Sequence, residues 1–343
     1  MSGRLLRLVC TAAVAAQAVL APSIAVAVPE PGERPVSRLL TDLQRLYREA
    51  EQATESYNAT EERLRKQRAE VRRLDGELAR ARLSLHDSRG AAGRLARQQY
   101  QGSTEISSYV RLLLARDPQH ALDQGHVIGQ LARERAETVG RLTGSERKAD
   151  ALARKARGAL DDRLALAERQ KKDRKKAEGR LKDVEELLAS LSPEQLAAVA
   201  ELEQQNIGEA QQDLVTSGAL GSDAHEPSRE GDRALRYAVQ QLDKPYEWGA
   251  EGPKTYDCSG LTSQAWARAG VPVPRTSQEQ WARLPRIPLT DLRPGDLVIY
   301  FPEATHVAMY LGDGKVIHAA LSARKVHVSP LAAHPVLGAV RPG

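Results

Sequence analysis

The sequence predicts an α+β protein in which a long antiparallel α-helical coiled-coil hairpin precedes a compact mixed domain. Apolar residues recur in alternating steps of three and four through residues 36–205, which is the spacing of a coiled-coil seam. Prolines are rare in this part, with two in residues 36–226 and twelve in residues 227–343. All three tryptophans and the one phenylalanine also lie in the second segment. We therefore expect a helical rod followed by a separately packed domain.

Residues 1–27 have the features of a signal peptide. Arg4 and Arg7 form a basic start, an uncharged apolar stretch follows, and residues 25–27 form a small-residue cleavage site. We expect cleavage, export, and a short leader at residues 28–35. The alternative is an uncleaved anchor, since the uncharged stretch is about long enough to span a bilayer.

The predicted rod occupies residues 36–205. The seam of its first helix consists of Leu43, Leu46, Ala50, Ala53, Tyr57, Leu64, Val71, Leu74, Leu78, Ala81 and Leu85. Only Thr60 and Gln67 interrupt this register, and a weaker seam continues downstream. A helix of this length needs a partner, so the two seams predict an antiparallel hairpin. We expect short helices at its tip, at about residues 102–125, where an apolar cluster marks either a local mini-core or a docking site.

Charge and linker composition constrain the remaining features of the chain. The net charge of +5 suits an anionic envelope polymer or membrane surface and is equally ordinary for a soluble protein. The basic run at residues 171–176 fits a solvated coiled-coil face better than an anionic-surface site. Zinc-finger spacings, basic–aromatic interleaving and phosphate loops are absent from the sequence, so we expect no nucleic-acid partner. Residues 206–228 predict a linker, in which residues 209–215 can add a helical turn or two, and we expect residues 229–343 to form the second domain.

Cys258 is the only cysteine once the signal peptide is removed. An intramolecular disulfide is therefore impossible, which leaves a reactive thiol, an intermolecular bond or a buried inert thiol. Asp257 is suited to cap a helix that begins at Cys258, because its carboxylate accepts hydrogen bonds from the first-turn amides. A thiol at a helix N-terminus has a lowered pKa, so we expect a thiolate nucleophile.

Two histidines lie on predicted strands downstream of this helix. Residues 306–311 and 315–320 read as strands joined by a Gly312-Asp313-Gly314 turn. Further elements are expected as a helix at residues 233–242 and strands at residues 297–301, 326–329 and 337–340. The hairpin places His306 and His318 on neighbouring strands, as base and orienting group for Cys258. The alternatives are core histidines or a zinc site made by these three side chains. His327 and His334 read as surface residues.

Six motifs in this domain resemble, in order, the signatures of the NlpC family of papain-like cysteine peptidases. They are residues 245–249 (PYEWG), 257–261 (DCSGL), 274–277 (PRTS), 294–297 (PGDL), 306–312 (HVAMYLG) and 318–319 (HA). The departures, Ala250 and Ala308 in place of glycines usual in the family, touch no catalytic group. The resemblance implies a helix that carries the cysteine, packed on a small antiparallel sheet.

The resemblance also implies residue roles. Cys258 corresponds to the nucleophile, His306 to the base and His318 to the third member, while Tyr246 corresponds to a tyrosine that helps hold the oxyanion. The candidates for gripping the charged substrate are Asp257, Ser259, Arg275 and Ser277, although Asp257 fits a capping role alone and Arg275 a loop-bracing role alone. The thiol motifs disfavour zinc, so we expect no metal and no cofactor.

The expected function is an exported, cell-wall-associated hydrolase. The family implies cleavage of peptidoglycan stem peptides at the bond between D-isoglutamate and the diamino acid. The alternatives are an N-acetylmuramoyl-alanine amidase on the same fold and a non-catalytic wall-binding adaptor of a divisome-type complex. We expect the hairpin to fold back over the groove near Cys258 until a membrane partner of the divisome type binds its tip.

Overall fold

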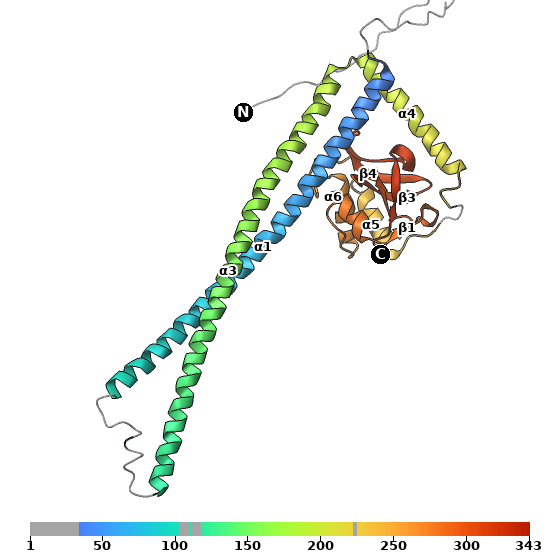
Figure 1. The fold of residues 1–343 in the computed structure, drawn as a ribbon. Coiled ribbons are helices and arrows are strands. Elements are labelled where there is room, and N and C mark those ends of the chain that lie inside the picture. The colour runs from blue at the N-terminus through green and yellow to red at the C-terminus, as the bar shows by residue number, and fades with distance from the viewer. Residues whose placement is uncertain (1–33, 103–109, 111–117, 222–224) are drawn as a thin grey trace, which may run out of the picture.

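The computed structural model describes residues 34–102, 110, 118–221 and 225–343, and Figure 1 shows their arrangement. The expected signal segment and most of the expected tip helices lie outside these residues. Two long helices form a rod, and the C-terminal domain lies beside the rod near the start of its first helix. Among the helices of the described residues, none is long and apolar enough to cross a lipid bilayer.

The rod is an antiparallel pair of helices, as the predicted fold class requires. Helix α1 spans Val36–Gly102 and helix α3 spans Pro118–Ser190 (Figure 1). The seam residues buried in α1 are Leu43, Ala50, Ala53, Leu64, Val71, Leu74, Leu78 and Ala81. Both polar interruptions bond across the seam: Thr60 Oγ1 donates to Asp173 over 2.7 Å, and Gln67 Nε2 donates to the Ala159 carbonyl over 2.9 Å. Polar groups in an apolar seam specify the register of the helices.

Helix α4, Pro193–Thr216, connects the rod to the C-terminal domain. Ser192 and Gln195 form a capping box that starts it, with Pro193 in the first turn. The helix continues through residues 206–216, which the sequence predicts as linker. Its side chain Gln211 donates to the Gly314 carbonyl over 3.2 Å and accepts from the Ala332 amide over 3.0 Å. The segment therefore packs on the domain instead of merely tethering it.

Residues 225–343 form three helices and a six-stranded antiparallel sheet. The helices are α5 (Arg229–Val239), α6 (Cys258–Arg268) and α7 (Ser277–Arg283). The strands, in spatial order, are β1 (Arg286–Ile287), β6 (Val336–Val340), β2 (Leu297–Tyr300), β3 (His306–Gly312), β4 (Lys315–Ala320) and β5 (Lys325–Pro330). Five strands lie where the apolar runs predict them. β1 and α7 are too short to produce a periodic signal.

The sheet is buried on both faces, which explains the continuous apolar runs of its central strands. Alternate residues point to opposite faces. One face packs against α6, in a cluster that includes Leu261, Trp266, Leu297, Ile299, Val307 and Met309. The other face includes Val298, Tyr300, Ala308 and Tyr310, with Leu214 and Leu220 packed against it. The helix that begins at Cys258 is thereby held against the strand that begins at His306.

Candidate active site

Cys258 is the first residue of α6, as the sequence predicts. The Asp257 side chain accepts a hydrogen bond from the Gly260 amide over 2.6 Å and so caps the helix. The thiol is almost fully buried, with 4% of the residue exposed. The Val307 backbone amide of β3 lies close enough to the thiol to lower its pKa. The nucleophile candidate therefore lies at the junction of helix and sheet.

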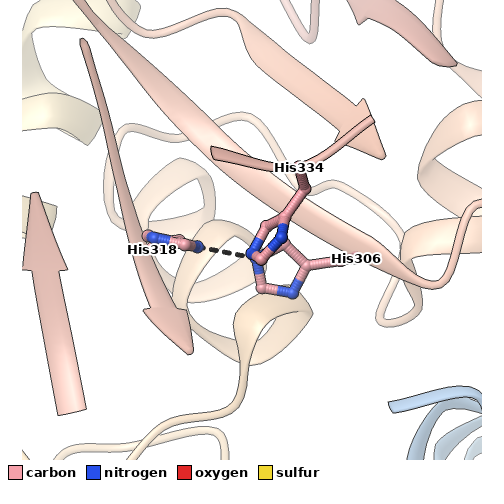
Figure 2. A group of neighbouring side chains, drawn as sticks. All are labelled: His306, His318 and His334. Atoms are coloured by element: carbon pink, nitrogen blue, oxygen red, sulfur yellow. Dashed lines mark hydrogen bonds between the residues drawn. The ribbon is translucent and has the colours of Figure 1, made fainter. Parts of the chain in front are cut away.

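His306 and His318 meet on neighbouring strands, also as predicted. His306 Nε2 lies 2.7 Å from His318 Nδ1 (Figure 2). On the far side of its ring, His318 Nε2 lies 3.0 Å from Ser329 Oγ. Burial, together with the nearby His306, lowers the pKa of His318 well below its usual range, so His318 is neutral. These contacts constrain the orientation of the His306 ring.

The four predicted substrate-binding residues lie together beside Cys258. Arg275 donates to both oxygens of Asp257, over 3.0 and 2.7 Å, and to the Ser259 hydroxyl over 2.8 Å. Asp257 therefore both caps α6 and holds the guanidinium. Ser277 begins α7 and turns its backbone amide toward the same place. Two hydrogen-bond donors, the Ser259 hydroxyl and the Ser277 amide, thus converge on one small pocket.

Helix α1 fills this pocket with a carboxylate. Glu55 accepts hydrogen bonds from the Ser259 hydroxyl over 2.6 Å and from the Ser277 amide over 3.0 Å. The Cys258 thiol donates to the same side chain over 3.8 Å. One turn further on, Asn58 Nδ2 donates to Asp257 over 3.0 Å. A helix some 200 residues away in the sequence therefore covers the nucleophile candidate.

One turn before Glu55, α1 also reaches the histidine pair. Glu51 Oε1 lies 3.2 Å from His306 Nδ1. This contact is an electrostatic one, because Nδ1 makes no aligned hydrogen bond within the described part of the chain. No hydrogen bond among the described residues joins the Cys258 sulfur to the His306 ring. Side chains of α1 therefore contact the Cys258 thiol and the His306 imidazole separately. In a working dyad the thiol and the imidazole would contact each other.

An aromatic contact fixes α1 on the domain. The rings of Tyr57 and Trp248 meet edge to face, with centroids 4.9 Å apart. Gly249 beside them has φ +76°, and a Cβ there would lie 3.2 Å from the Tyr57 ring. A side chain at this position would be strained in backbone and crowded by α1. The close approach of α1 thus depends on a glycine.

Burial under α1 reverses the predicted direction of the thiol pKa. The pKa of Cys258 is raised well above its usual range by burial, then by the charges of Glu55, Asp257 and Glu51. The Val307 amide lowers it, but by less. The expectation of a lowered thiol pKa is therefore wrong for this docked arrangement. The N-terminus of α6 favours the thiolate, but burial of the thiol and the three nearby carboxylates disfavour it more strongly.

The same surroundings act on Glu55 itself. Burial, followed by the charge of Asp257, raises the pKa of Glu55 to about 7, although Arg275 opposes the shift. Tyr246 lies next to the site because it bridges to Tyr256 just before the cysteine. Burial and the charge of Cys258 raise the pKa of Tyr246 well above its usual range, so its hydroxyl stays a hydrogen-bond donor.

Sequence reasoning missed the α1 residues and one histidine. Glu51, Glu55 and Asn58 follow a step of four and then three residues on a face beside the seam, a pattern that also fits a solvated helix surface. His334 is not on the surface as predicted: it is partly buried, and its ring centroid lies 5.3 Å from that of His306. His327 is also partly buried, 4.5 Å from the His318 ring. His334 reaches the pair from the turn before β6, whereas His327 lies on β5 directly opposite His318.

Comparison with known proteins assigns the C-terminal domain. The NlpC/P60 family profile matches residues 243–337. A "Probable endopeptidase" of Corynebacterium glutamicum strain R is 38% identical over 128 residues, which make up 37% of this chain and 61% of that protein. A second C. glutamicum relative is 42% identical, over 32% of this chain and 53% of its own length. The chain thus spans little more than half the length of these curated relatives.

Solved structures include a domain of the same size. The P60 domain of the antigen MAP1204 from M. avium subspecies paratuberculosis is 35% identical, with a TM-score of 0.30, over 32% of this chain and 94% of that one. The profile and the curated relatives identify the C-terminal domain as an NlpC/P60 domain.

Proposed function

We propose that the protein is an exported thiol endopeptidase that cuts the peptidoglycan stem peptide between D-isoglutamate and the diamino acid, and that α1 holds it latent. The observation that carries the proposal is Cys258 at a helix N-terminus beside the oriented pair of His306 and His318. The family and the relatives named probable endopeptidases support the reaction class. The signal-like residues 1–27 support export.

The chemistry proceeds once α1 has moved away. His306 Nδ1, relieved of Glu51, takes the Cys258 proton, and the thiolate attacks the scissile carbonyl carbon. The Cys258 amide and the Tyr246 hydroxyl stabilise the oxyanion. His306 then gives its proton to the leaving amine, the C–N bond breaks, and a thioester remains. His306 next deprotonates a water that attacks the thioester, which releases the acid and restores the thiol. His318 acts as a positioning residue throughout.

The pocket that holds Glu55 supports the choice of bond. The Ser259 hydroxyl and the Ser277 amide both donate to a carboxylate there, and Arg275 lies directly behind the Ser259 hydroxyl. A D-isoglutamyl residue is linked through its side chain, so its α-carboxylate is free next to the scissile bond. We assign that carboxylate to this pocket, where it replaces Glu55.

Latency follows from the same contacts. Three side chains of α1 engage the site: Glu51 contacts the base His306, Glu55 fills the carboxylate pocket, and Asn58 donates to Asp257. Their displacement requires a movement of the rod, and the part of the described rod far from the domain is the end where α1 finishes and α3 begins (Figure 1). We propose that a membrane complex of the divisome type supplies this movement. If deletion of residues 28–205 left activity on wall fragments unchanged, restraint by the hairpin would be excluded.

Mass spectrometry of purified muropeptides tests the reaction. Residues 229–343 are incubated with stem peptides, alongside the Cys258→Ala variant. Fragments split after D-isoglutamate, absent in the variant, support the endopeptidase. Release of the intact stem from the sugar identifies the amidase instead. Binding without cleavage, by a folded domain whose thiol still reacts with iodoacetamide, identifies the wall-binding adaptor. RipD of Mycobacterium tuberculosis, 29% identical with a TM-score of 0.31 over 33% of this chain and 98% of that one, is described as a non-catalytic NlpC/p60 domain protein.

A further inference from the structure

A third imidazole joins the catalytic histidine pair. One ring nitrogen from each of His306, His318 and His334 lies within 4.8 Å of the others. The ring centroids of His334 are 5.3 Å from His306 and 6.0 Å from His318 (Figure 2). His334 comes from the turn before β6, not from the strands that carry the pair. Its position has no part in the peptidase chemistry proposed above.

His306 Nε2 and His318 Nδ1 face each other and are the inner nitrogens of the pair, whereas His306 Nδ1 and His318 Nε2 are the outer nitrogens. Oxygen atoms beside the outer nitrogens favour ring protons at those positions. A neutral imidazole carries one N–H. The Glu51 carboxylate, 3.2 Å from His306 Nδ1, favours the proton on that outer nitrogen. Ser329 Oγ, 3.0 Å from His318 Nε2, is placed to accept a hydrogen bond from an N–H on the other outer nitrogen, since its own hydroxyl donates to the Pro330 carbonyl. Without a metal the inner nitrogens, 2.7 Å apart, share one hydrogen-bond proton; a cation bound there moves this proton to an outer nitrogen and takes both inner lone pairs. Carboxylate and hydroxyl partners on the outer nitrogens are typical of metal-bound histidines.

Space beside the cluster also suits a metal ion. A cavity of about 330 Å³, lined by His334, Glu51 and Phe301 among others, adjoins the cluster. It provides an entry path and room for a water molecule as fourth ligand.

We propose that His306, His318 and His334 bind one divalent transition-metal ion, with Zn²⁺ as the best match to three imidazoles and a water, and that the bound ion blocks peptidase activity. The ion separates the inner nitrogens slightly and displaces the proton between them. Metal bound at Nε2 removes the basicity that His306 needs toward Cys258. This ligand set differs from the zinc set of Cys258, His306 and His318 weighed from the sequence, and it revises the expectation of no metal. The inhibition rests on the proposed function, whereas the binding does not.

Titration of the full chain from residue 28 tests the binding, with Zn²⁺ by calorimetry and Co²⁺ by absorption. We expect one site per chain, and intense visible Co²⁺ bands that indicate four-coordination. His334→Gln lowers the affinity at least roughly tenfold. His327→Gln, a matched control beside His318, and Cys258→Ser both keep it. Circular dichroism confirms that each variant is folded. Equal affinity in the His334 and His327 variants, loss of binding in Cys258→Ser, or weak octahedral Co²⁺ bands would overturn the site.

Inhibition is measured on the Glu55→Ala protein, whose hairpin is weakened but whose histidine cluster is intact. Zn²⁺ should stop muropeptide cleavage at the concentration that fills the site, and His334→Gln should raise that concentration in proportion to its lost affinity. Zinc that fills the site without slowing cleavage would refute the inhibitory role. Absence of any cleavage without zinc would count against the proposed function, while the titration still decides whether the site exists.

Discussion

Glu55 makes the docking of α1 dependent on pH, and we predict that docking weakens as the pH rises from about 5 to 8. Burial and the charge of Asp257 raise the pKa of Glu55 from 4.5 to about 7, despite the opposing charge of Arg275. Between these values the docked helix keeps a proton that the undocked helix releases, so each rise in pH favours undocking. At about 1.4 kcal/mol per pH unit, the loss reaches about 3 kcal/mol, or roughly a hundredfold in the docking equilibrium. Above about pH 7 the loss levels off.

Energy transfer between two dyes measures this effect. The dyes are attached to cysteines at the exposed positions Leu83 and Ala267, in residues 28–343 with Cys258→Ser. The matched control is Glu55→Gln, which resembles the protonated carboxyl and does not titrate. The undocked fraction should rise with pH in the parent and should rise less in the control, because other groups titrate equally in both. Identical pH profiles, or tighter docking of the parent at high pH, would refute the role of Glu55.

Three further predictions concern single side chains. Glu51→Ala removes a carboxylate that raises the Cys258 pKa, so iodoacetamide should alkylate the thiol faster at pH 7; an unchanged rate would contradict the proposed electrostatic restraint. Tyr57→Ala loses the edge-to-face contact with Trp248, which should weaken docking by about 1 kcal/mol in the same dye assay, whereas the exposed control Leu164→Ala should not. Trp266→Ala empties a buried site and frees the Gly295 carbonyl, so urea unfolding of the C-terminal domain should show a loss of about 3–5 kcal/mol; a loss below about 1 kcal/mol would contradict the packing described.

Local patterns were enough to predict the elements that carry the chemistry. Asp257 caps the helix that begins at Cys258, and the two histidines lie on strands joined by a glycine turn; each depends on residues close in the sequence. The seam of α1 was predictable for the same reason, since its period repeats over many turns. The pair at His306 and His318 follows once the two strands are neighbours in one sheet.

Contacts between distant segments could not be predicted in this way. Glu51 and Glu55 are polar residues on an amphipathic helix, and their spacing is the same whether they face water or another domain. The raised thiol pKa depends on those contacts, so the local cap indicated the opposite direction. His334 lies in a turn without periodicity, and only the folding of that turn over β3 brings it to the pair. Residues 206–216 were expected to be linker because the heptad periodicity fades and glycines appear there, although contacts with the domain accompany a helix that continues to Thr216.

The most direct test of the central claim is a time course of muropeptide cleavage by residues 28–343 and residues 229–343 on one stem-peptide substrate, each with its Cys258→Ala control. A latent thiol peptidase predicts that the isolated domain cuts after D-isoglutamate, that the longer chain cuts far more slowly, and that both controls are inactive. Equal rates for the two chains would contradict restraint by α1, and cleavage that survives Cys258→Ala would contradict the thiol mechanism.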